Sequence, residues 1–157
     1  MAAAGNDSSI LIAYDGSDFA KAAIEEVAKL VGPGRKVLVT TVSEPLEGIP
    51  FIGAAGVPID PDSMASILDA ARSGAEKTAA EGCELAAEAG LEAEPLVVIG
   101  APVWERIVAA AEEHGAGLIA IGSRGLSGLK HAILGSVAAA VAQHSKRSVL
   151  IVHTGAK

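Results

Sequence analysis

Aromatic residues are scarce in this sequence, which contains two Phe, one Trp and one Tyr among 157 residues. A hydrophobic core must therefore be built from Ala, Val, Ile and Leu. Apolar residues make up 50% of the chain, which excludes disorder for most of it. The length fits one domain. Glycine is abundant instead, with 18 residues, and in such numbers it lets backbone approach backbone or a ligand closely.

Cysteine and clustered basic residues are also lacking. Cys83 is the one cysteine, so an intramolecular disulfide and a Cys-rich zinc site are excluded. The formal net charge is −7 without any run of Lys and Arg, which argues against a nucleic-acid polymer or an anionic membrane as the main partner. No run of about 18 apolar residues is present, and residues 1–9 do not resemble a signal peptide. We therefore expect a soluble, cytoplasmic protein.

Short apolar runs alternate with longer Ala- and Glu-rich segments of helical periodicity. This alternation predicts βαβ units and a parallel sheet, and the apolar character of the strands indicates burial on both faces. The predicted fold class is α/β, a doubly wound five-stranded parallel sheet with flanking helices, in a single domain over residues 10–157 after a flexible tail of residues 1–9. Strands are expected at 10–14, 37–42, 91–99, 118–121 and 148–153, and helices at 18–31, 62–89, 102–114 and 136–143. Pro95 predicts that the first half of the third strand lies at an edge of the sheet.

Two segments between the predicted strands bear on ligand binding and on the continuity of a helix. In doubly wound folds a ligand binds outside the carboxyl ends of the strands, where the strand order reverses. Residues 43–61 follow the second strand and are rich in Gly and Pro, and their length exceeds that of most loops, which indicates a functional or a mobile segment. Gly74 and Gly82 fall inside the long helix predicted next, and they argue against its continuity.

The end of the fourth predicted strand carries the most specific pattern in the chain. Gly122-Ser123-Arg124-Gly125 is followed after nine residues by Gly135-Ser136-Val137, which begins a helix. In a glycine-lined turn the backbone N–H groups point inward. At the N-terminus of a helix, the free N–H groups and the positive end of the dipole form an anion site. Arg124, Lys130 and His131 add positive charge. The pattern predicts a site for a di- or triphosphate.

Other nucleotide-binding motifs are excluded by the residues after the first predicted strand. A P-loop requires Gly-Lys-Ser/Thr, and the dinucleotide fingerprint requires three closely spaced glycines at that place. This chain has Asp15-Gly16-Ser17 there. The same residues argue against an adenylyl transferase or an ATP pyrophosphatase, whose His-x-Gly-His or Ser-Gly-Gly-x-Asp-Ser signatures stand at this position.

The spaced glycines resemble the ATP-binding motif of the universal stress protein family. Residues 10–17 resemble the family's first strand and its Asp-Gly-Ser turn, residues 97–102 its third strand, and residues 148–152 its closing strand. The resemblance covers nearly the whole chain and implies a Rossmann-like, adenine nucleotide alpha hydrolase-like sheet with a nucleotide at the switch point. It also implies ATP with Mg²⁺ or Mn²⁺ as the ligand, and a homodimer through Val149–Val152.

The resemblance assigns roles to individual residues. Asp15 matches an acidic residue near the ribose, Val42 a position whose backbone contacts adenine, and Ala13 a place where the nucleotide packs against backbone. The glycines of the motif and Ser136 match phosphate-binding positions. The complete expected nucleotide site is Ala13, Asp15, Val42, Ile121, Gly122, Ser123, Arg124, Gly125, Gly135, Ser136 and Val137.

Two positions depart from the family pattern, and the site offers no evident catalytic base. Ser148 stands where a Pro usually begins the closing strand, and Ala138 lacks a hydroxyl that some members carry. Because the motif supplies binding groups without a carboxylate near the terminal phosphate, we expect ATP binding with slow or absent hydrolysis, as in a nucleotide-responsive switch of a stress response. A ligand such as cyclic AMP or AMP, a weak ATPase and a nucleotide-free dimerisation module remain alternatives.

Overall fold

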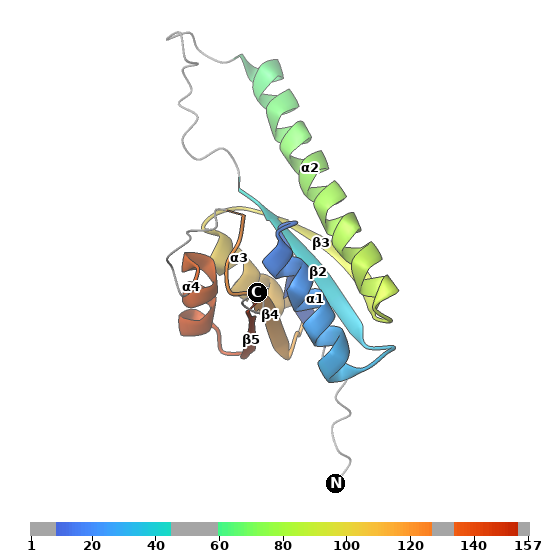
Figure 1. Cartoon of the computed structure of the whole chain (residues 1–157). Helices are drawn as coiled ribbons and strands as arrows, with labels where there is room; N and C mark the ends of the chain where they lie inside the picture. The colour runs from blue at the N-terminus through green and yellow to red at the C-terminus, as the bar shows by residue number, and fades with distance from the viewer. Residues whose placement is uncertain (1–8, 45–59, 127–133, 154–157) are drawn as a thin grey trace.

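The computed structural model describes residues 9–44, 60–126 and 134–153. Within these ranges the chain forms nine elements, each bounded within one residue of the expectation from sequence. The α/β fold class predicted from the alternating pattern is confirmed (Figure 1). In chain order the elements are β1 Ile10–Ala13, α1 Asp18–Val31, β2 Lys36–Ser43, α2 Pro61–Glu88, β3 Glu92–Ile99, α3 Val103–Glu113, β4 Leu118–Gly122, α4 Ser136–His144 and β5 Ser148–Val152.

The strands of the described ranges form one parallel sheet in the order β3-β2-β1-β4-β5. The chain winds from β1 outward to β3, crosses back to the other side of β1, and continues through β4 to β5. The strand order therefore reverses between β1 and β4. In a doubly wound sheet this reversal opens a crevice at the carboxyl ends of the two strands.

Alternate residues of β1 enter two separate cores on opposite faces of the sheet. Ile10 and Ile12 pack with residues of α1 and α2, whereas Leu11 and Ala13 pack with residues of α3 and α4. Figure 1 shows the two helix pairs on opposite sides of the strands. Much of each helix contact is made by alanine, so the helices pack on the sheet without aromatic side chains.

Burial on both faces, which we expected for the strands in general, is wrong for β3. Glu92, Glu94, Pro95 and Ile99 are exposed, because β3 lies at the edge of the sheet. Pro95 lacks an N–H donor and fits this location, as its sequence context predicted. The acidic side chains and the proline make β3 a poor edge for pairing with a further strand.

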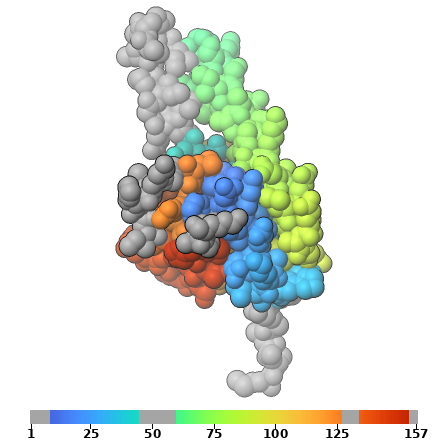
Figure 2. Space-filling model, viewed as in Figure 1, coloured from blue at the N-terminus to red at the C-terminus, as the bar shows by residue number. Residues whose placement is uncertain are grey.

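Helix α2 runs without a break through both glycines that argued against its continuity. Its buried residues are Ala75, Ala79, Gly82 and Ala86, all in the second half, and its first half projects from the body of the domain (Figure 2). The second half is tied to the end of β1, since the Tyr14 hydroxyl donates to Glu81 Oε1 at 2.8 Å. This hydrogen bond, together with Lys21, lowers the pKa of Glu81 below its usual value.

Some expectations concern residues outside the described ranges. These are the flexibility of the tail over residues 1–8, the connection at 45–59, and the charges of Lys130 and His131. Ser9, the last residue of the predicted tail, is described, and its carbonyl accepts a hydrogen bond from Gly117 N at 3.0 Å. Across the described residues, no helix is long and apolar enough to cross a membrane.

Candidate functional site

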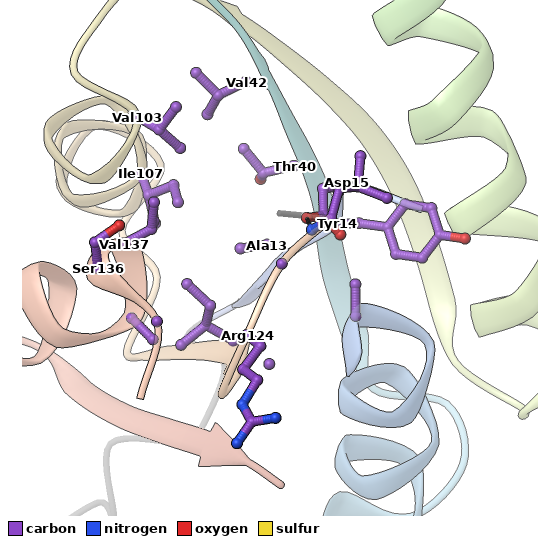
Figure 3. Close-up of a pocket in the computed structure, with 17 residues that line it drawn as sticks. Ala13, Tyr14, Asp15, Thr40, Val42, Val103, Ile107, Arg124, Ser136 and Val137 are labelled. Atoms are coloured by element: carbon purple, nitrogen blue, oxygen red, sulfur yellow. Dashed lines mark hydrogen bonds between the residues drawn. The ribbon is translucent and has the colours of Figure 1, made fainter. Parts of the chain in front are cut away.

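A pocket of about 340 Å³ lies at the switch point of the sheet. Its walls come from the carboxyl ends of β1, β2 and β4, from the turn after β4, from the start of α1, from the first two turns of α3 and from the first turn of α4 (Figure 3). Elements far apart in the sequence thus meet in one cavity. Both its size and its place are typical of small-molecule sites in doubly wound folds.

One side of the pocket is apolar. Val42 lines it from β2, and Val103 and Ile107 line it from successive turns of α3. Ala13 at the end of β1 and Ile121 in β4 complete this side with one small and one branched side chain. A flat apolar group, such as a purine base, can bury its faces against aliphatic side chains of this kind.

The N-terminus of α4, which lacks a side-chain cap, also lines the pocket. Gly135 is the N-cap residue, and the first bond of the helix runs from Ala139 N to the Gly135 carbonyl at 2.9 Å. The N–H groups of Ser136, Val137 and Ala138 therefore have no partner within the helix. All three residues line the pocket, so these donors and the helix dipole favour an anion there.

The turn after β4 is fastened to its surroundings through Ser123. Ser123 N donates to the Val152 carbonyl at 2.8 Å, and the Ser123 carbonyl accepts from Gly135 N at 2.6 Å. These two bonds join the turn to the end of β5 and to the start of α4. Ser123 is 2% exposed and does not line the pocket, so it positions the turn instead of facing a ligand.

Asp15 connects the end of β1 to the same turn. Its Oδ1 atom accepts a hydrogen bond from Ser17 N at 2.9 Å, and its Oδ2 atom accepts from Leu126 N at 3.1 Å. Each carboxylate oxygen has a second lone pair available, so Asp15 can still accept from a ligand hydroxyl. We expected a contact with the ribose from this residue, and the structure adds a second role in holding the exit of β4.

Close packing requires glycine at the three motif positions Gly122, Gly125 and Gly135, a reason that the sequence alone did not indicate. None of the three has a positive φ; each instead allows a close approach between protein segments. A Cβ on Gly122 would lie 2.8 Å from the backbone of Phe19, one on Gly125 would lie 2.7 Å from Asp15 Oδ2, and one on Gly135 would lie 3.2 Å from the Ser123 carbonyl oxygen. The glycines bring the pocket walls together, and ligand contact is not needed to explain them.

The structure brings ten of the eleven expected site residues to the wall of one pocket, all except Ser123. Seven further residues line the pocket and were not predicted from the sequence. Val103 and Ile107 are separated by one helical turn after the predicted third strand, which is a signal that would have placed them on one face. The missed lining residues are Tyr14, Ala20, Thr40, Val103, Ile107, Leu126 and Ala138.

Protein ligands for a metal ion are sparse around this pocket. Within the described parts of the chain, no three His, Cys, Asp or Glu side chains gather closely enough to hold an ion. Mg²⁺ commonly takes its ligands from substrate phosphates and water, with one or two carboxylates from the protein. The residues therefore fit a divalent ion that arrives with a polyphosphate, with Asp15 as the acidic residue lining the pocket.

Fold and pocket together define a doubly wound α/β domain with a ligand-sized cavity at its switch point. The chain belongs to the universal stress protein family, whose sequence model matches residues 8–153. It is 36% identical to the universal stress protein YxiE of Bacillus subtilis over 154 residues, which cover 91% of this chain and 97% of that protein.

Solved structures of universal stress proteins have the same fold. The archaeal protein MJ0577 of Methanocaldococcus jannaschii superposes with a TM-score of 0.77 at 24% identity, over 96% of this chain and 98% of that one. A universal stress protein in complex with cAMP superposes with a TM-score of 0.59 at 28% identity, over 94% of this chain and 98% of that one. The likeness to MJ0577, at 24% identity, concerns the fold alone.

Proposed function

We propose that this protein binds ATP in the switch-point pocket and acts as a nucleotide-responsive switch in a stress response. The observation that carries the proposal is the pocket itself, a cavity of about 340 Å³ that is lined both by an apolar wall and by the uncapped N-terminus of α4. An adenine base and a chain of phosphates have the two chemistries that these sides require. The cAMP complex of a relative at 28% identity supports an adenine nucleotide as the ligand class.

Each part of the nucleotide has a counterpart in the proposed site. The base lies against Val42 and the ribose near Asp15, with the nucleotide packing along the end of β1 at Ala13. The N–H groups of α4 and of the turn after β4 bind the phosphates. Mg²⁺ or Mn²⁺ accompanies ATP and neutralises part of the phosphate charge. The phosphate-binding residues are Gly122, Arg124, Gly125, Gly135, Ser136 and Val137, with Ile121 beside them.

We propose that the protein binds ATP and hydrolyses it slowly or not at all. Phosphoryl transfer requires a group that orients or deprotonates the attacking nucleophile. Among the described residues that line the pocket, the carboxylate is Asp15, which is assigned to the ribose and not to the terminal phosphate. Phosphate release from Mg-ATP at about 1 per second or faster, as in kinases, would contradict a binding role.

The direct test is calorimetry of the purified protein with ATP, ADP, AMP and cyclic AMP, each with and without Mg²⁺. We expect saturable binding of ATP that strengthens with Mg²⁺, because the ion neutralises phosphate oxygens next to an acidic protein. Cyclic AMP binding tighter than ATP binding would favour the second candidate, a cyclic-nucleotide sensor, which the cAMP complex of the relative supports. Absence of heat with all four nucleotides would overturn the proposal.

We also propose a homodimer formed through β5. This strand pairs with β4 on one side and lies at the end of the described sheet, and Val149, Leu150 and Ile151 are only half-buried. An apolar edge strand of this kind is covered by pairing with a second copy. Sedimentation at micromolar concentration is expected to give twice the mass of one chain. The Leu150→Lys variant is expected to shift the measured mass toward that of one chain. A wild-type monomer would contradict the dimer.

A further inference from the structure

The side chain of Arg124 stands out among the residues that line the pocket. Among the described lining residues, only Arg124 and Asp15 carry formal charges, and the chain as a whole has a net charge of −7. Arg124 forms no ion pair with any described residue. Its guanidinium lies instead over the ring of Phe19, with Cζ 5.7 Å from the ring centroid. A cation on an aromatic face is held in place without being neutralised.

Both partners of this contact are fixed by their backbones. Phe19 belongs to the first turn of α1, and Gly122 packs so closely on it that an added Cβ would lie 2.8 Å from Phe19. On the other side, Gly135 approaches the Arg124 Cα so closely that its own Cβ would lie 3.4 Å away. The ring and the base of the arginine side chain therefore keep a constant relation to the start of α4.

Arg124 lines the pocket at a distance from its apolar wall. Figure 3 shows Arg124 away from Val42 and Val103, on the side of the pocket that faces α1. The neighbouring α4 N-terminus offers N–H donors, which suit a phosphate group of any kind. A guanidinium adds a charged, two-pronged donor that matches a terminal phosphate, which has several free oxygens.

We propose that Arg124, presented by the Phe19 ring, determines specificity between nucleotides with a free phosphate chain and cyclic nucleotides. This inference depends on the proposed function of the pocket. A polyphosphate reaches past the α4 N-terminus and receives a bidentate, charge-assisted contact from Arg124. A cyclic phosphate is esterified twice, carries one negative charge and has no terminal group to extend toward the arginine. Arg124 is thus a ligand-binding residue, and Phe19 is a positioning residue that acts through it.

The test compares ATP with Mg²⁺ and cyclic AMP in wild type, Arg124→Gln and Phe19→Leu. Arg124→Gln is expected to lower ATP affinity about tenfold or more while cyclic AMP affinity changes less than about threefold. Phe19→Leu is expected to lower the ratio of ATP to cyclic AMP affinity by a smaller factor, and Phe19→Tyr to restore it. In the Arg124→Gln background, Phe19→Leu is expected to leave that ratio unchanged, because the two residues act as one unit.

Arg72→Gln is the matched control, since it removes the same charge from an exposed arginine on α2 that pairs with Glu76. It is expected to leave both affinities unchanged. Equal losses for ATP and cyclic AMP in Arg124→Gln, or no loss for either, would overturn the role of Arg124 and leave the proposed function standing. A wild-type protein that binds neither nucleotide would overturn both.

Discussion

Ser136→Pro is expected to lower the affinity for ATP about tenfold or more while the protein remains folded. Ser136 is the first residue of α4, where proline is tolerated because its φ suits the helix and its missing N–H has no intrahelical partner. Gly135 has φ −67° and ψ 153°, which is a conformation allowed before proline. The substitution therefore removes one N–H donor and one hydroxyl from the pocket. A hydrogen bond to a charged phosphate is worth about 1.5–3 kcal/mol.

Ser136→Ala separates the two donors, because it removes the hydroxyl and keeps the N–H group. We expect a smaller loss of affinity than in Ser136→Pro, measured by calorimetry with Mg-ATP. Circular dichroism and thermal unfolding of both variants check that the fold persists. Unchanged ATP affinity in Ser136→Pro, with the fold intact, would remove the α4 N-terminus from the proposed phosphate site.

Gly82→Ala is expected to destabilise the fold by about 1–2 kcal/mol in spite of the higher helix propensity of alanine. A Cβ at this position would lie 2.6 Å from Val39 Cγ1 and within 2.9 Å of two atoms of the Tyr14 ring. Val39 and Tyr14 are buried in the core beneath α2, so neither can move aside cheaply. The measurement is the free energy of unfolding from a denaturant titration.

Gly74→Ala is the matched control within the same helix. Gly74 is exposed, and no atom lies within 4 Å of the position of its Cβ. Removing the backbone freedom of glycine from an exposed helix interior is expected to stabilise the protein by about 0.5–1 kcal/mol. Opposite signs for the two variants are the expected outcome. A stabilised Gly82→Ala variant would contradict the close packing of α2 on Val39 and Tyr14.

Most of the fold could be predicted because its signals are local. Short apolar runs for the strands and a period of 3.6 residues for the helices, together with stop signals such as Gly32 and Gly90, mark each described element within one residue. The exposure of β3 was indicated by Pro95 alone, which favours the edge of a sheet. Strand order decides which strands lie at an edge, and an apolar run in the sequence carries little information about its place in that order.

The candidate site was predictable to the extent that its members follow strands or begin a helix. The glycine spacing from Gly122 to Gly135 and the position of Asp15 after β1 identified most of the pocket wall. The lining contributions of Thr40 and Ala20 were missed, because nothing in their local sequence distinguishes a residue that faces a cavity from one that faces a core. That distinction depends on the gap left between elements.

The sequence by itself determined the class of fold, the family resemblance and the segment able to bind an anion, because glycine spacing and helix starts are properties of short stretches of chain. Only the tertiary structure decided what the glycines are for and how the pocket is held. The Asp15 carboxylate reaches Leu126 N across 111 residues, and the Tyr14 hydroxyl reaches Glu81 across 67. Contacts at such separations arise when the sheet brings strand ends together, and no local pattern encodes them.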